Sequence, residues 1–240
     1  MLFRETIKNT LRRLGYDITK ISVTSNSSLQ LVKGFESFSI DLVLDVGANV
    51  GQFAKEIRNY GYTDEIVSFE PLSSAYAKIS NACKGDPKWR VHKRCAIGDI
   101  DGETSINISS NSVSSSVLPM TELHTNASVG SSYIGSETVD ISRLDTVGQE
   151  YISKSKNTFL KIDTQGFDWQ VIEGAQGVLS QIKGIHCEMS ILPLYEGQHL
   201  WLDVIKNLED MGYTLWSIQK GFSDERNGRS LQVDLVFYRL

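Results

Sequence analysis

Apolar and polar positions along the chain follow two periods, one typical of buried strands and one typical of amphipathic helices. Short apolar runs predict strands at 42–46, 65–70, 89–97, 158–163, 184–189, 213–219 and 231–240. Apolar residues that recur every three or four positions predict helices near 51–60, 73–83, 171–179 and 200–211. Segment 100–140, rich in polar residues, interrupts this alternation.

The order of these elements predicts an α/β fold, with a mostly parallel, Rossmann-like sheet and helices on both faces. The last two strands have no helix between them, so we expect them to pair as an antiparallel hairpin at one edge. Ligands bind such sheets at the carboxyl ends of the strands. The functional site is therefore expected there.

The N-terminal part of the chain differs from the rest. In a helix predicted over 2–14, one face is apolar and carries Phe3, Ile7, Leu11 and Leu14. We expect this helix to pack on the domain, with a role at a membrane surface or with a partner as the alternative. Residues 17–40 are polar and serine-rich and indicate a linker or cap. The sequence thus divides into an N-terminal helix with a cap or linker (1–40) and one domain (41–240).

Composition narrows the class of protein. The 240 residues are 40% hydrophobic and 22% charged, as in ordinary soluble domains, and the formal net charge of −5 gives no reason to expect a nucleic-acid partner. No apolar run reaches the ~20 residues that cross a bilayer. The N-terminus lacks the continuous apolar core of a signal peptide. Cys83, Cys95 and Cys187 are widely spaced, which indicates reduced thiols in a cytoplasmic protein.

The candidate ligand site begins at the turn Asp-Val-Gly-Ala-Asn-Val-Gly that follows the first strand. Gly47 and Gly51 allow the backbone to approach a ligand closely. Free N–H groups of the next helix and the carboxylate of Asp45 would bracket a polar, partly cationic molecule. Glu70 and Asp163 also fall at the carboxyl ends of predicted strands. Three acids are therefore expected to converge.

Two cofactors use a glycine turn after the first strand and an acid after the second, namely a nicotinamide dinucleotide and S-adenosylmethionine. Glu70 lies 19 residues after Gly51 and suits the ribose hydroxyls. A pyrophosphate needs Gly-x-Gly-x-x-Gly, whereas the spacing here is Asp-x-Gly-x-Asn-x-Gly. The carboxylate of Asp45 would repel a pyrophosphate and attract the ammonium and sulfonium groups of S-adenosylmethionine. The spacing favours S-adenosylmethionine.

Five motifs occur in a specific order: Asp45 to Gly51, Phe69-Glu70-Pro71, Ala96-Ile97-Gly98, Arg143-Leu144-Asp145 and Leu160 to Gly166. With them the chain resembles, over residues 42–218, the FkbM family of S-adenosylmethionine-dependent methyltransferases. Described members of that family methylate hydroxyl groups of sugars or macrolides. The resemblance therefore implies an enzyme that transfers a methyl group to a hydroxyl of a small molecule, glycan or natural product.

The resemblance also implies roles for individual residues. The cofactor would be held by Asp45, Gly47, Ala48, Asn49, Gly51, Glu70, Pro71, Ala96, Ile97, Ser115 and Asp163. Glu70 would bind the ribose, and Ala96 with Ile97 would lie beside the adenine. Ser115 belongs to a serine-rich segment that resembles the family's loop near the cofactor.

Methyl transfer to a hydroxyl requires that the partners be positioned and the proton removed. The candidate bases are Asp163, Asp168, His186 and Glu188. Asp163 could equally hold the ammonium group of the cofactor, and Asp168 could simply be the polar first turn of its helix. His186 is open to a purely structural interpretation, whereas Glu188 in an apolar strand requires a partner or a function.

Gln165 and Tyr195 are expected to contact the acceptor. Tyr195 follows the fifth strand in a loop that suits stacking on a sugar face. No clear set of ligands supports a metal ion, so none is expected. Whether the chain forms a homo-oligomer is left open by the sequence.

Three alternatives to an O-methyltransferase remain. A non-catalytic cofactor-binding module would keep Asp45 and Glu70 but tolerate the loss of Asp163 and Glu188. A nicotinamide oxidoreductase is disfavoured by the glycine spacing. A nucleic-acid methyltransferase is disfavoured because Asp-Thr-Gln-Gly, which begins at Asp163, replaces the Asn/Asp-Pro-Pro-Tyr/Phe tetrad used on base amino groups.

Overall fold

The structure is a computed structural model that describes residues 2–128 and 130–240, without the side chains of residues 2–4. The predicted position of the Phe3 side chain, on the apolar face of the N-terminal helix, therefore lies outside what the structure describes. No helix in the described part has an apolar stretch long enough to span a bilayer.

A seven-stranded sheet forms the centre of the domain, in the order β3-β2-β1-β7-β8-β10-β9. Its strands are β1 (Leu42–Val46), β2 (Glu65–Phe69), β3 (Trp89–Val91), β7 (Thr158–Ile162), β8 (Ile182–Ser190), β9 (Thr214–Lys220) and β10 (Gln232–Tyr238). The first five strands of this order pair in parallel, and β10 is antiparallel to both of its neighbours. The predicted α/β class with a mostly parallel sheet is confirmed.

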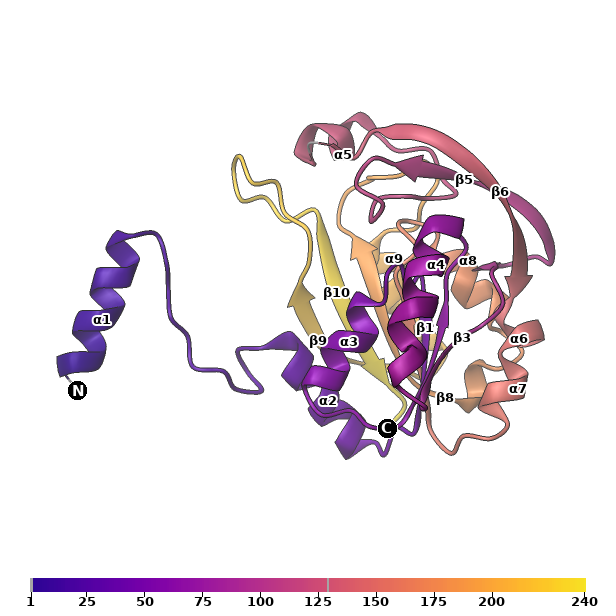
Figure 1. The fold of residues 1–240 in the computed structure, drawn as a ribbon, viewed down its shortest axis with the longest axis horizontal. Coiled ribbons are helices and arrows are strands. Elements are labelled where there is room, and N and C mark those ends of the chain that lie inside the picture. Colours follow the sequence, from indigo (N-terminus) through magenta and orange to yellow (C-terminus); the bar gives the residue numbers. More distant parts are fainter. Residues whose placement is uncertain (1, 129) are drawn as a thin grey trace.

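Helices cover both faces of this sheet (Figure 1). One face carries α2 (Ser27–Ser37), α3 (Gln52–Asn59) and α4 (Ser73–Ala82), and the other carries α8 (Asp168–Gly174) and α9 (Trp201–Asp210). Side chains of β1 alternate between the two cores, as the pleat of a strand requires: Val43 belongs to the first, and Leu42, Leu44 and Val46 to the second.

The two final strands pair in an antiparallel manner as predicted, but β10 lies inside the sheet and β9 forms the edge. The side chain of Tyr238 in β10 is fully buried and stacks on Phe38 with ring centroids 4.0 Å apart. Leu235 and Phe237 belong to one core and Val236 to the other with Tyr238, so both faces of β10 are buried, as is typical of an interior strand.

A second sheet lies over the carboxyl ends of the first (Figure 1). It has three strands in the order β4-β6-β5, with β4 (Ala96–Gly98), β5 (Gly102–Ser109) and β6 (Tyr133–Arg143). The prediction of one strand over 89–97 is wrong. The chain bends at 92–95, so β3 before the bend joins the main sheet and β4 after it joins the second sheet. In the bend, the guanidinium of Arg94 donates to the carbonyl of Pro71 and pairs with Glu137 on β6.

Short helices complete the domain, namely α5 (Glu122–Ala127), α6 (Leu144–Val147), α7 (Gln149–Ile152), η1 (Cys83–Gly85) and η2 (Leu179–Gln181). The segment 17–40 contains α2, which was not predicted as a helix. Its residues Leu31, Val32 and Phe35 are buried, so part of this segment belongs to the core.

Helix α1 (Leu2–Arg13) matches the predicted helix in extent but not in position. Figure 1 shows it apart from both sheets, joined to the domain by an extended segment. No residue from Glu5 to Ser25 is buried. The prediction that this helix packs on the domain is therefore wrong.

Candidate functional site

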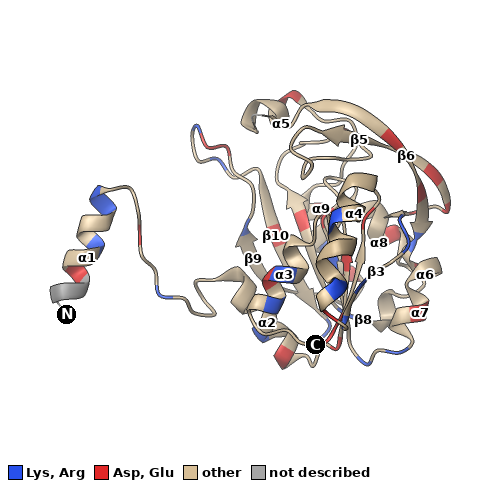
Figure 2. Ribbon diagram, in the orientation of Figure 1, with Lys and Arg blue, Asp and Glu red and all other residues tan. Residues whose placement is uncertain are grey.

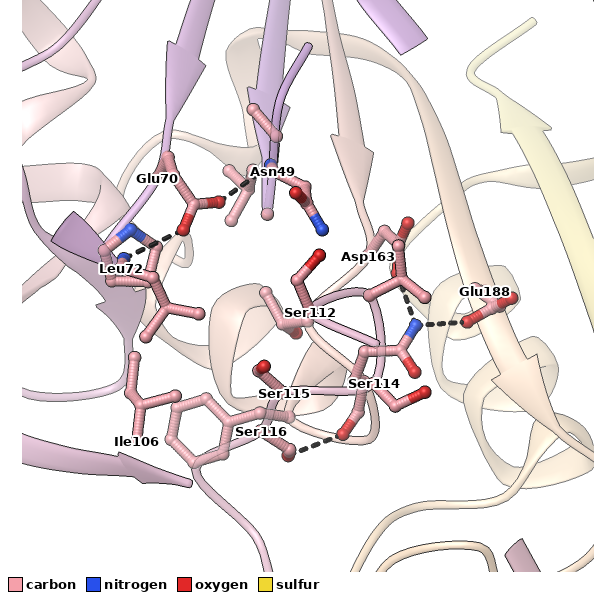
Figure 3. A pocket seen from close by; sticks show the side chains of 18 of the residues that line it. Asn49, Glu70, Leu72, Ile106, Ser112, Ser114, Ser115, Ser116, Asp163 and Glu188 are labelled. Carbon is pink, nitrogen blue, oxygen red and sulfur yellow. Dashed lines mark hydrogen bonds between the residues drawn. The ribbon is translucent and has the colours of Figure 1, made fainter. Parts of the chain in front are cut away.

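A cavity of about 470 Å³ lies between the carboxyl ends of the main strands, such as Val46 and Phe69, and the second sheet, which contributes Ala96, Ile97 and Ile106. Twelve residues expected from the sequence line it: Gly47, Ala48, Asn49, Glu70, Pro71, Ala96, Ile97, Ser115, Asp163, Gln165, His186 and Glu188. Figure 3 shows Glu70 and Asn49 on one side, Asp163 and Glu188 on the other, and the side chains of a serine-rich loop between them. We call these two sides the Glu70 end and the Glu188 end.

The turn after β1 packs tightly against the end of β7. Gly47 has a φ of +73°, and a Cβ there would lie 1.9 Å from the carbonyl oxygen of Asp163. No residue but glycine fits this approach. The backbone N–H of Asn49 then donates to Oε2 of Glu70 at 2.7 Å, which ties the turn to the end of β2.

Glu70 is almost fully buried, and Oε1 accepts a second hydrogen bond from the N–H of Leu72 at 2.8 Å. Burial raises the pKa of Glu70 to about 7, although the amides of Leu72 and Asn49 lower it. A carboxylate offers about four lone-pair sites, so lone pairs remain for hydroxyl donors. Glu70 can accept hydrogen bonds from a ribose once it is ionised.

Asp45 lies beneath the turn and does not line the cavity. Its carboxylate is fully buried and pairs with Nζ of Lys161 on β7 at 3.1 Å, and Nζ lies 3.6 Å from Oδ2 of Asp163. Burial alone would lower the pKa of Lys161, but the charges of Asp45 and Asp163 outweigh it and the pKa is raised. Lys161 therefore stays protonated. Asp45 does not reach the cavity itself, but it holds the Lys161 ammonium that lines it.

The Glu188 end is organised by one amide. Nε2 of Gln165 donates to Oδ1 of Asp163 and to Oε2 of Glu188, each at 2.8 Å, and so holds two carboxylates together (Figure 3). Oε1 of Gln165 accepts from the hydroxyl of Tyr195 at 2.8 Å, and its backbone carbonyl accepts from Oγ of Ser116. Every hydrogen-bonding group of this side chain thus has a defined orientation.

Glu188 differs from an ordinary carboxylate. Burial raises its pKa well above the usual value, and the negative charge of Asp163 adds to the shift. Oε2 also accepts from Nε2 of Gln232 on β10 at 3.1 Å. A carboxylate with a raised pKa binds a proton more readily at neutral pH, as a general base requires.

Four predicted site residues do not line the cavity, namely Asp45, Gly51, Asp168 and Tyr195. Gly51 caps α3, and Asp45 was described above. The carboxylate of Asp168 is fully buried and accepts from the N–H groups of Thr164 and Gly166, so it fixes the loop after β7 and does not reach an acceptor. Burial raises the pKa of Asp168 to about 7, and the negative charge of Asp163 is the second largest cause.

The expectation that Tyr195 stacks on an acceptor needs correction. Its ring is fully buried in a small apolar cluster with Leu194 and Leu231, and its hydroxyl is used by Gln165. Tyr195 can only support Gln165 from behind.

His186 on β8 lines the cavity, with Nε2 3.5 Å from Oδ1 of Asp234 and its ring 6.0 Å from that of Phe53. The structure adds lining residues that the sequence did not single out: Lys161, Leu72, Phe167, His124, Phe222 and Gln232. A lysine within an apolar strand was a signal for Lys161. His124 gave none, because it comes from the irregular segment; burial lowers its pKa to about 4, so it is neutral.

The residues present at the Glu70 end fit S-adenosylmethionine. Oδ1 of Asn49 is buried there without a hydrogen-bond partner among the described residues, and Glu70 has free lone pairs for hydroxyls. Ile97 and Leu72 provide apolar surface for a planar base. Within residues 2–128 and 130–240, no group of three or more His, Cys, Asp or Glu is arranged to hold a metal ion.

Most of the residues that line the cavity belong to a segment that matches a known protein family. The model of the family described as Methyltransferase FkbM domain matches residues 45–215, which is more than half of the chain. The chain belongs to the FkbM methyltransferase family. This FkbM protein is therefore a methyltransferase that uses S-adenosylmethionine, and the expected cofactor is confirmed.

No curated protein matches the sequence of this FkbM methyltransferase. Similar solved structures include Sp1610 of Streptococcus pneumoniae in complex with S-adenosyl-L-methionine, 12% identical, which covers 89% of this chain and 72% of that one with a TM-score of 0.49. An rRNA methylase from Streptococcus thermophilus is 8% identical, with coverages of 93% and 99% and a TM-score of 0.49. Fibrillarin of Aeropyrum pernix is 8% identical, with coverages of 82% and 66% and a TM-score of 0.46.

Proposed function

We propose that this FkbM protein methylates a hydroxyl group of a sugar, glycan or natural product. The observation that carries the proposal is the pair of carboxylates, Asp163 and Glu188, joined by the amide of Gln165 at one end of the cavity. A hydroxyl is a weak nucleophile until its proton is removed, so a partly buried base with a raised pKa suits it. S-adenosylmethionine, when bound, supplies the methyl group on a sulfonium centre.

The Glu70 end is the proposed cofactor side. Glu70 accepts hydrogen bonds from ribose hydroxyls, and Ala96, Ile97 and Pro71 border the base. Asn49 offers its unpartnered Oδ1 to a donor. The backbone of the turn at Gly47 and Ala48 lies close to the proposed cofactor position. Ser115 belongs to the serine-rich loop that lines the same cavity.

The Glu188 end is the proposed acceptor side. Glu188 removes the hydroxyl proton, and Gln165 and Gln232 orient its carboxylate. Asp163, next to the Lys161 ammonium, faces the cationic part of the cofactor. His186 remains a second candidate base. Neither of its ring nitrogens has a hydrogen-bond partner among the described residues, and Nε2 has only the ionic contact with Asp234 at 3.5 Å.

The proposed acceptor is uncharged at its reacting end. The described residues that line the cavity include four carboxylates, at Glu56, Glu70, Asp163 and Glu188, and one lysine, which is already paired. This excess of negative charge would repel phosphate groups, and so it disfavours nucleic acid as the acceptor. A cytoplasmic location is supported by three free cysteines, at positions 83, 95 and 187.

Cofactor affinity should depend on pH through Glu70. Because its pKa is raised to about 7, the carboxylate becomes protonated as the pH falls through 7 and then lacks a lone pair for one ribose hydroxyl. We expect the Kd for S-adenosylmethionine, measured by calorimetry, to rise about tenfold from pH 8 to pH 6. Glu70→Gln should bind more weakly and with little pH dependence; the same slope in this variant would assign the titration to another group.

The acceptor class can be tested directly. The protein is incubated with S-adenosylmethionine and neutral methyl glycosides, polyketide alcohols, sugar phosphates, amines or RNA, and S-adenosylhomocysteine is measured by mass spectrometry. We expect turnover with neutral hydroxyl compounds and an O-methyl signal in the NMR spectrum of the product. N-methylated products, or turnover with RNA alone, would contradict the proposal.

A further inference from the structure

Helix α1 and the segment after it have apolar side chains that the domain leaves uncovered. Ile7, Leu14 and Ile21 are 39%, 67% and 65% exposed. The extended segment from residue 14 to residue 26 separates α1 from the domain (Figure 1). An amphipathic helix in this position has its apolar face available for another surface.

The apolar and charged residues of α1 occupy different sides. Ile7 and Leu11 are four residues apart, and Leu14 follows directly after the helix, so helical spacing places them on one side and Lys8, Arg12 and Arg13 elsewhere. Figure 2 shows the basic residues along α1, which also carries the acidic Glu5 in its first turn. Arg12 pairs with Asp17 at 3.1 Å, but both side chains are more than half exposed, and such a pair contributes little. The helix therefore presents an apolar stripe flanked by cations.

The charge of the rest of the chain limits the choice of partner. The whole protein has a formal net charge of −5, although α1 is basic. An anionic surface would attract α1 and repel the domain. Because residues 14–26 can span up to about 40 Å, α1 can lie on such a surface while the domain stays beyond the Debye length of about 8 Å.

We propose that α1 binds the surface of an anionic lipid bilayer. Ile7, Leu11 and Leu14 enter the boundary between headgroups and acyl chains, and Lys8, Arg12 and Arg13 contact lipid phosphates. The basic residues select the charge of the surface, and the apolar stripe distinguishes a bilayer from a soluble polyanion. Docking of this kind is reversible and independent of the methyltransferase site.

The test uses the full chain and sedimentation with vesicles of phosphatidylcholine, alone or in a two-to-one mixture with phosphatidylglycerol. We expect binding to the mixed vesicles that weakens about tenfold without the anionic lipid and also falls at high salt. Ile7→Asp with Leu11→Asp, and separately Arg12→Glu with Arg13→Glu, should each lower binding about tenfold or more.

A matched control carries Lys154→Glu and Lys156→Glu, the same change of charge at two exposed positions before β7. It should bind vesicles within about twofold of the parent if the charges of α1 act locally. All variants should keep their affinity for S-adenosylmethionine, which shows that the domain is folded. Equal binding by the Ile7/Leu11 variant and the parent overturns the proposal. So does an absence of vesicle binding together with self-association that Ile7→Asp abolishes, because a second copy is then the occupant.

Discussion

Replacement of Glu188 by Gln should lower kcat by about a thousandfold, within the range that general-base catalysis contributes. The amide keeps the shape of the side chain and can still accept from Gln165 and Gln232, so the cavity is preserved. Only the ability to take up a proton is lost. The measurement is steady-state turnover with an acceptor identified by the screen, beside calorimetry for the cofactor, whose Kd should change less than about twofold because Glu188 lies at the other end of the cavity.

The pH profile provides a second measure. Glu188 must be ionised to accept a proton, and its pKa is raised well above the usual value, so kcat should fall on the acid side from a higher pH than for an ordinary carboxylate. The residual rate of Glu188→Gln should lack this acid limb. Glu103→Gln, the same change at an exposed position on β5, should leave turnover unaltered. Normal turnover in Glu188→Gln would remove Glu188 from the mechanism and leave His186 as the candidate base.

Replacement of Asp45 by Asn should lower the free energy of unfolding by about 3 kcal/mol, because it leaves the buried ammonium of Lys161 without its principal counter-charge. The pair is 3.1 Å apart, and the side chains of Lys161 and Asp45 are 6% and 0% exposed. Asp163, 3.6 Å from Nζ and more exposed, compensates only in part. Urea denaturation with a constant m-value is the measurement.

The chain contains a matched comparison for this pair. Lys88 and Asp64 are also 3.1 Å apart, but their side chains are about half exposed. Asp64→Asn should therefore cost less than about 1 kcal/mol. Addition of Lys161→Met to Asp45→Asn should recover most of the loss, since the buried charge is removed together with its partner. If Asp45→Asn costs no more than Asp64→Asn, the buried ion pair does not stabilise the fold.

The sequence predicted the parts of the site that are local. The turn after β1 and the loop after β7 each follow a short apolar run, so both could be placed at strand ends, and the acids at their boundaries followed. The α/β class was predictable for the same reason. Lys161 belongs to one of these segments, but its pairing with Asp45 depends on the register between β1 and β7, which no local pattern encodes.

Features that depend on long-range contacts were missed. The strands β5 and β6 of the second sheet are rich in polar residues and have few buried positions, so they lack the apolar pattern of a buried strand. Helix α2 begins in a serine-rich stretch that resembles a linker, and only three large apolar side chains secure it. The burial of Tyr195 follows from its packing on Leu231 and its hydrogen bond to Gln165, both distant in the sequence, which alternation along the chain does not report.

The place of β10 has a consequence for biosynthesis. It follows β8 and β9 in the chain yet lies between them, so both strands keep an unpaired edge until the ribosome has added Gln232 and the residues after it. Unpaired edges are templates for aggregation. Gln232 also donates to Glu188, so the proposed base gains this partner only at the same late step. A chain whose translation stalls before β10 would therefore carry the cofactor turn but lack both the strand that joins β8 to β9 and the contact of Gln232 with Glu188.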